Sequence, residues 1–202
     1  MTLIRPYQPS DRDDLYRVCV LTGASGGDAT GLYSDDALLP DIFAGPYAAY
    51  QPDLAFVVDT GDHVAGYVIA VADSLAYADW YDAEWRPGFI AAHPLESAKD
   101  DNERGMIGYG RNVRGSIPPE VAEYPAHLHI DLLPELQGQG FGRRLIRTLL
   151  AALRERGVPA VYLTMSPDNH DARAFYDRLG FHELPSSTPR GPVLGIRTDA
   201  TV

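Results

Sequence analysis

The chain has 202 residues, 45% of them hydrophobic and 22% charged, a balance typical of one globular α/β domain with an ample core. Its formal net charge of −11 argues against nucleic acid or an acidic membrane as a general partner, because both attract basic surfaces. The single cysteine, Cys19, excludes an intramolecular disulfide, and the lack of a signal peptide or long apolar run favours a cytoplasmic location.

The N-terminal part of the chain reads as a strand, a helix and a hairpin. Residues 2–6 are expected to form a short apolar strand, and Pro9 and Ser10 then introduce a helix that runs to about Leu21, with Ser10 as its N-cap. Two apolar runs, 54–58 and 64–72, are separated by a Gly- and Asp-rich turn and predict an antiparallel hairpin.

A long aromatic and then polar segment, residues 73–125, follows this hairpin. Short helices are expected at 75–85 and 95–104, and the rest reads as loop. A connection of this length is often functional, so the segment is a candidate cap for a substrate cleft. The simpler interpretation, which we favour for most of its large aromatic residues, is packing against the sheet.

A glycine-rich turn between a strand and a helix organises the second half of the chain. The apolar strand at 127–132 is followed by Gly138, Gly140 and Gly142, and then by a helix over 143–156 with leucines at helical spacing. A turn of this kind at a helix N-terminus suits a phosphate group. The P-loop pattern is absent, and the spacing of the glycines does not fit a dinucleotide fingerprint.

The remaining elements complete an alternating pattern of strands and helices. A strand is expected at 160–165, a helix from a cap at Asp168 or Asn169 to Gly180, and two last strands at 181–184 and 193–196. The order β-α-ββ-β-α-β-α-β-β predicts an α/β layered domain.

Two motifs in this half resemble those of the GNAT superfamily of N-acetyltransferases. Residues 137–142 match the Q/R-x-x-G-x-G/A signature, and residues 169–181 match the N-x-x-A-x-x-x-Y-x-x-x-G-F run. The resemblance implies one GNAT domain over 1–202, with a mixed, mostly antiparallel sheet flanked by helices and an insertion at about 73–125. That insertion and the stretch 124–131 are similar to the acetyltransferase-like C-terminal domain of O-GlcNAcase, of a free-standing bacterial type.

The resemblance also implies acetyl-CoA as cofactor. The backbone of the glycine turn would hold the pyrophosphate, and the free backbone edge of the 130–132 strand would pair with the pantetheine arm and the acetyl carbonyl. The cofactor-binding residues implied are Ile130, Asp131, Leu132, Gln137, Gly138, Gln139, Gly140, Phe141, Gly142, Arg143, Asn169 and Tyr176. No metal site is expected.

Acetyl transfer to an amine needs an acid for the leaving thiolate and a base for the amine. Tyr176 matches the family's general acid, whereas Thr164 occupies the place where many relatives have a glutamate base. Asp131, His129 and His127 are the candidate bases, and strand alternation places all three on one face. Asp131 ranks first because by resemblance it lies nearest the acetyl position.

The function expected is therefore an acetyl-CoA-dependent N-acetyltransferase in which an amine attacks the thioester directly. The acceptor, a small-molecule or peptide amine, is not specified by the residues, and the oligomeric state is open, a homodimer included. The alternative is a catalytically silent acetyl-CoA-binding or protein-interaction module, which the missing glutamate supports.

Overall fold

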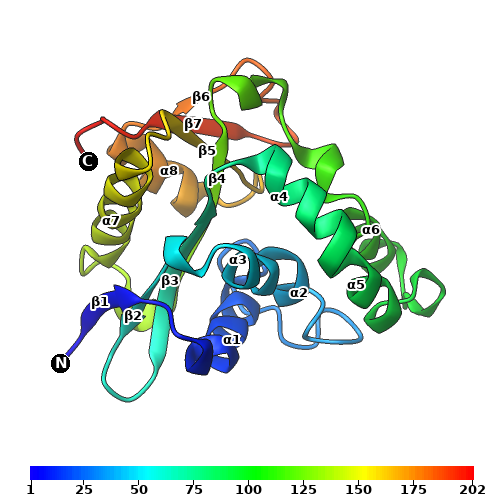
Figure 1. Ribbon diagram of the computed structural model, residues 1–202. Coiled ribbons are helices and arrows are strands. Elements are labelled where there is room, and N and C mark those ends of the chain that lie inside the picture. The colour runs from blue at the N-terminus through cyan, green and yellow to red at the C-terminus, as the bar shows by residue number, and fades with distance from the viewer.

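The computed structural model describes residues 1–202, and a seven-stranded sheet in the order β1-β2-β3-β4-β5-β7-β6 runs through it (Figure 1). Neighbouring strands are antiparallel except β4 and β5, which are parallel. This confirms the mixed, mostly antiparallel sheet predicted from the sequence. The strands are β1 (Leu3–Pro6), β2 (Ala55–Asp59), β3 (Val64–Val71), β4 (Ala126–Leu132), β5 (Ala160–Thr164), β6 (His182–Glu183) and β7 (Val193–Arg197).

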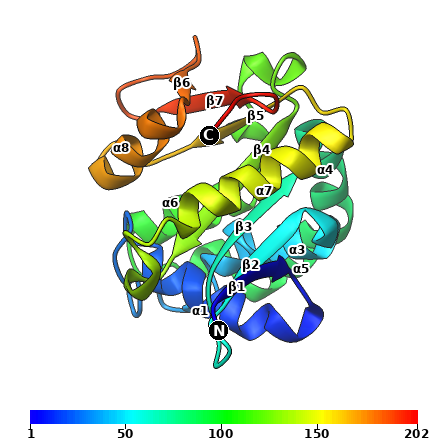
Figure 2. The same cartoon turned by 90° about the vertical axis from the view of Figure 1, so that its left-hand side faces the viewer.

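Helices cover both faces of this sheet. In Figure 2, α7 crosses in front of the central strands, while α1, α3 and α5 lie behind them. None of the helices is both long and apolar enough to cross a membrane. The helices are α1 (Arg12–Thr22), α2 (Pro40–Phe43), α3 (Gly45–Tyr50), α4 (Ser74–Trp80), α5 (Arg86–Ala92), α6 (Asp101–Gly110), α7 (Phe141–Glu155) and α8 (His170–Leu179).

The core lies on both sides of the central strand β3, all of whose residues are buried. From one side it receives the apolar face of α7, whose leucines and isoleucine recur at helical spacing and are buried. Full burial of one such side chain stabilises the fold by roughly 1.5–3 kcal/mol. The buried set on α7 is Phe141, Gly142, Leu145, Ile146, Leu149, Leu150 and Leu153.

The start of the first helix differs from the prediction. A 3-10 turn, Pro9–Asp11, precedes α1, and Ser10 is not its N-cap. Asp11 instead accepts the backbone N–H of Gln8 at 2.8 Å and binds the Arg5 guanidinium at 2.7 Å. This carboxylate satisfies the turn and ties it to β1, which a pattern of cap residues alone does not reveal.

The segment after β3 is more helical than predicted. The expected helix at 75–85 continues from α4 through a π-helical turn, Tyr81–Trp85, into α5, and the second helix is α6 instead of 95–104. Asp100 sets its start by accepting the N–H of Glu103 at 2.8 Å. The short helices α2 and α3, each with proline in the first turn, were not predicted.

Candidate functional site

The sheet parts where β4 leaves β5. Their register joins only residues 126–127 to 161–162, and the rest of β4 has no partner on that side. On the other side β4 pairs with β3 over residues 127–132, and Leu133 donates its N–H to the carbonyl of Ala65 at 2.9 Å. Because peptide groups alternate between the two edges of an antiparallel strand, those of Ile130 and Leu132 point into the gap.

A cleft of about 560 Å³ occupies this gap. Its walls come from the end of β4, the glycine turn, α8 and the residues after α1. All the cofactor-binding residues predicted from the sequence line the cleft except Gln139, whose side chain donates to the carbonyl of Glu135 instead. Thr22, Ser25 and Gly26 also line it, and no sequence motif had marked them. Ser25 reaches across to Ser166 at 3.2 Å.

The glycine turn presents free backbone donors to the cleft. Gly138 has φ 72° and Gly140, the N-cap of α7, has φ 79°, a left-handed conformation that favours glycine. No backbone N–H from Gly138 to Arg143 donates to a protein acceptor. These donors meet the positive end of α7, an arrangement that binds phosphate groups.

Tyr176 reaches the cleft from α8. The residue is 7% exposed, and its ring packs against Phe175 and Phe181, with ring centres 5.2 and 5.1 Å away. Burial, and secondly the charge of Asp131, raises the pKa of the Tyr176 hydroxyl above its usual range. The phenol is therefore protonated at neutral pH. Asn169 caps the same helix by accepting the N–H of Ala172 at 3.0 Å, so the cleft residue is also the N-cap.

Asp131 lines the cleft from β4, which contacts α1. Its Oδ2 accepts the hydroxyl of Tyr67 at 2.6 Å. Burial raises the pKa of the Asp131 carboxyl, and the hydrogen bond from Tyr67 opposes that rise. Asp131 and Tyr176 thus line one cleft, to which β4 contributes a carboxyl group and α8 a protonated phenol.

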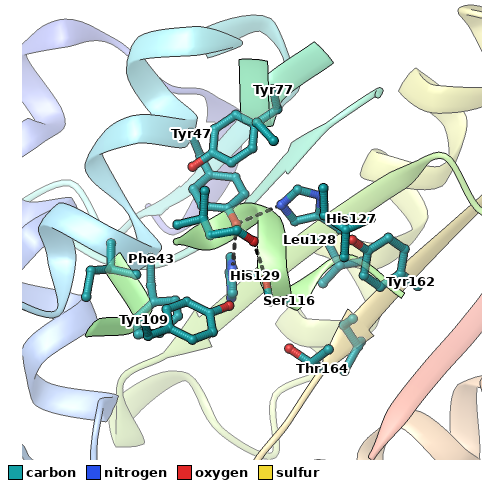
Figure 3. A pocket seen from close by; sticks show the side chains of 15 residues that line it. Phe43, Tyr47, Tyr77, Tyr109, Ser116, His127, Leu128, His129, Tyr162 and Thr164 are labelled. Atoms are coloured by element: carbon teal, nitrogen blue, oxygen red, sulfur yellow. Dashed lines mark hydrogen bonds between the residues drawn. The ribbon is translucent and has the colours of Figure 1, made fainter. Parts of the chain in front are cut away.

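The two strand histidines lie further back along β4 and meet at one hydroxyl (Figure 3). Tyr47 Oη lies 2.8 Å from Nε2 of His127 and 2.9 Å from Nε2 of His129. Nδ1 of His127 lies 2.7 Å from Oγ of Ser74. Burial lowers the pKa of His127 to about 3, with a further contribution from His129, and burial lowers the pKa of His129 to about 4.

These histidines border a narrow aromatic pocket that adjoins the cleft along β4. Its volume of about 20 Å³ holds about one water molecule. No charged side chain lines it. Thr164, where a glutamate was sought, lies exposed at its edge. The residues after β3 supply much of the wall, so they line this pocket as well as packing on the core. The lining aromatic residues are Phe43, Tyr47, Tyr77, Tyr109 and Tyr162.

The titratable residues do not gather into a metal centre. No group of three or more His, Cys, Asp or Glu side chains is arranged to hold a metal ion. Cys19 is buried, and burial raises the pKa of its thiol well above the ordinary value. The thiol is therefore protonated and unreactive at neutral pH.

The acetyltransferase (GNAT) family model matches residues 28–181 of this chain. The chain belongs to the GNAT family. The crystal structure of SsHAT is similar to this GNAT chain with a TM-score of 0.87 and 43% identity over 98% of both chains. The complex of yncA from Salmonella typhimurium with its cofactor acetyl-CoA has a TM-score of 0.55 and 14% identity over 98% of this chain and 94% of that one, which shows the shared fold alone.

Two curated relatives extend the comparison. O-GlcNAcase of Rattus norvegicus is 23% identical over 186 residues, 90% of this GNAT chain and 20% of that protein. The ribosomal protein bS18-alanine N-acetyltransferase of Escherichia coli K12 is 31% identical over 93 residues, 46% of this chain and 63% of that enzyme. The chain therefore spans about a fifth of the rat protein. These findings confirm the GNAT resemblance and the similarity to O-GlcNAcase predicted from the sequence.

Proposed function

We propose that this chain is an acetyl-CoA-dependent N-acetyltransferase that acts on a small-molecule or peptide amine. One observation carries the proposal. Free backbone donors from Gly138 to Arg143 meet the N-terminus of α7 at a cleft that opens where β4 leaves β5. Acetyl transfer from acetyl-CoA needs such a place for a diphosphate and an extended arm, and the first N–H groups of a helix are free to bind an anion there.

The residues present fit acetyl-CoA. The glycine turn and Arg143 would hold the diphosphate, and the peptide edges of Ile130 and Leu132 would hold the amide-bearing arm. Gln137 donates to the carbonyl of Leu132 at 3.3 Å and would have to release it or share it. When bound, acetyl-CoA supplies the acetyl group as a reactive thioester.

The roles of the side chains follow from their positions. Tyr176, held protonated in the cleft, would give its proton to the departing thiolate. Asp131 shares that cleft and stays the first candidate to receive a proton from the amine during direct attack. His129 and His127 remain candidates on the side of the aromatic pocket, where the acceptor would enter.

Calorimetric titration with acetyl-CoA tests the cofactor site. Gly140→Asp places a carboxylate beside the proposed diphosphate position and should abolish binding. Gly157→Asp is the matched control, because Gly157 at the far end of α7 has φ 73° and an open surround like that of Gly140. Equal binding by the wild type and both variants would contradict the site.

Release of free thiol over a panel of amines then tests catalysis. A real acceptor should react more slowly with Tyr176→Phe, by about 10²-fold for a lost general acid, while the affinity for acetyl-CoA persists. Tight binding of acetyl-CoA without turnover on any amine would instead support the silent module, which the threonine at position 164 favours.

A further inference from the structure

Four polar side chains form one continuous series of hydrogen bonds, and three of them line the aromatic pocket. His129 contacts Tyr47, Tyr47 contacts His127, and His127 contacts Ser74, each at 2.7–2.9 Å. Ser74 Oγ in turn lies 2.7 Å from the carbonyl oxygen of Pro125. The chain joins β4 to α3 and to α4, and it ends in a group that can only accept.

The number of protons available fixes which group donates in each of these hydrogen bonds. A carbonyl oxygen carries no hydrogen, so at 2.7 Å the Ser74 hydroxyl must donate to Pro125. His127 then donates to Ser74 from Nδ1–H, and its Nε2 is a lone pair. Tyr47 has one proton, which it gives to that lone pair, and it therefore accepts the Nε2–H of His129. Nδ1 of His129 is left as a lone pair.

This lone pair on Nδ1 of His129 is the unpaired end of the series of hydrogen bonds. Nδ1 of His129 has no hydrogen-bond partner in the protein, while His129 lines the aromatic pocket. The pKa values of His127 and His129, lowered by burial to about 3 and about 4, keep both rings neutral near pH 7. The free nitrogen is thus an acceptor in a pocket without charged side chains.

We propose that Tyr47 is a positioning residue which, through Ser74 and His127, holds the Nδ1 lone pair of His129 ready to accept a hydrogen bond from the acceptor amine. The inference rests on the proposed function and deepens it. An amine N–H that donates to this nitrogen would be turned so that its own lone pair is free for attack. The narrowness of the pocket favours a primary amine on an unbranched stem.

Nitrogen-15 NMR of protein labelled in histidine reads the tautomers without any turnover. The wild type should show a bare Nδ1 on His129 and a bare Nε2 on His127, assigned with His129→Asn and His127→Asn. Tyr47→Phe and Ser74→Ala should each destroy this pattern. Tyr50→Phe, on the same helix and without a hydrogen bond to either ring, should preserve it. A protonated Nδ1 on neutral His129 in the wild type would overturn the proposal.

Titration with methylamine is the second arm. Methylamine should shift the Nδ1 resonance of His129, and the bulky tert-butylamine should not. With an acceptor found by thiol release, Tyr47→Phe should lower kcat about tenfold, which corresponds to the loss of about one hydrogen bond. The affinity for acetyl-CoA should be unchanged. No response of Nδ1 to methylamine would sink the inference even if acetyl-CoA binds. If acetyl-CoA does not bind but the tautomers and the methylamine shift are as stated, the proposed function fails and the amine site stands.

Discussion

The pKa values of many single side chains in this protein are shifted chiefly by burial. His127 and His129 show it most clearly, since burial lowers their pKa values to about 3 and about 4, against about 6.5 in an unfolded chain. The unfolded state therefore binds more protons than the folded state between those limits. Stability that is present above pH 6.5 is lost as the pH falls towards 4.

We expect the free energy of unfolding to decrease by up to about 1.4 kcal/mol per pH unit for each of these histidines below pH 6. Urea denaturation at pH 7, 6 and 5 measures it. His129→Gln should flatten the slope against pH, whereas substitution of the exposed His170 by Gln should leave it unchanged. A slope that is the same in the wild type and in His129→Gln would show that His129 can be protonated freely in the folded state.

The limits of sequence reasoning are also visible at single residues. Tyr176 and Asn169 were found because their motif has fixed spacing, and the cleft lining includes both. Tyr47 and Ser74 were not found, because they reach His127 from 80 and 53 residues away. No local pattern marks a partner that only the tertiary fold brings near.

At the scale of elements, α7 has one glycine that is kept for space and not for backbone conformation. A Cβ on Gly142 would lie 2.9 Å from the ring of Phe175 on α8, whereas a Cβ on Gly105, within α6, would meet nothing within 4 Å. Alanine is favoured over glycine inside a helix by about 1 kcal/mol. The two positions therefore differ only in what surrounds them.

Gly105→Ala should stabilise the protein by about 0.5–1 kcal/mol. Gly142→Ala should gain less or lose stability, because the Phe175 ring must move, and the displaced ring should weaken acetyl-CoA binding in the cleft that it lines. Thermal denaturation and calorimetry measure both effects. Equal stabilisation by the two variants, with equal affinity, would mean that the α7–α8 contact is looser than the structure shows.

Elements with a strong period were predicted well. The strands at 55–59 and 64–71 and the helix at 141–155 lie close to their expected positions, because alternation and helical spacing are local properties. The helices α2 and α3 are only a turn or so long, and α4 passes into α5 through a π-helical turn. Such elements form because neighbouring parts of the fold support them, so their sequences carry little signal of their own.

At the scale of the whole molecule, Asp41 links three parts of the fold. Its carboxylate accepts the hydroxyl of Tyr16 on α1 at 2.6 Å and lies 2.9 Å from Nε2 of His93, beyond α5. Its backbone carbonyl accepts the indole N–H of Trp85 at 2.9 Å. The helices after β3 are thereby tied to α1 and α2, next to the aromatic pocket.

Asp41→Ala should lower the free energy of unfolding by about 2–4 kcal/mol, because it leaves the buried His93 and the Tyr16 hydroxyl without a partner. Asp36→Ala, an exposed change in the loop before α2, is the control. Chemical denaturation gives the difference. A loss below about 1 kcal/mol would indicate that water replaces the carboxylate and that the aromatic contacts alone hold these helices.

The separation of β4 from β5 interrupts the hydrogen bonding of the sheet. Strands β1 to β4 and strands β5 to β7 are two half-sheets that share only a short seam, residues 126–127 with 161–162, while α7 crosses beside it. Beyond that seam, the backbone groups on one edge of β4 have no partner strand. An extended ligand with amide groups, such as the arm of the proposed cofactor, would form hydrogen bonds like those of an added strand. It would thereby connect the two half-sheets into one sheet. The cleft is thus a gap in the sheet that its ligand would fill.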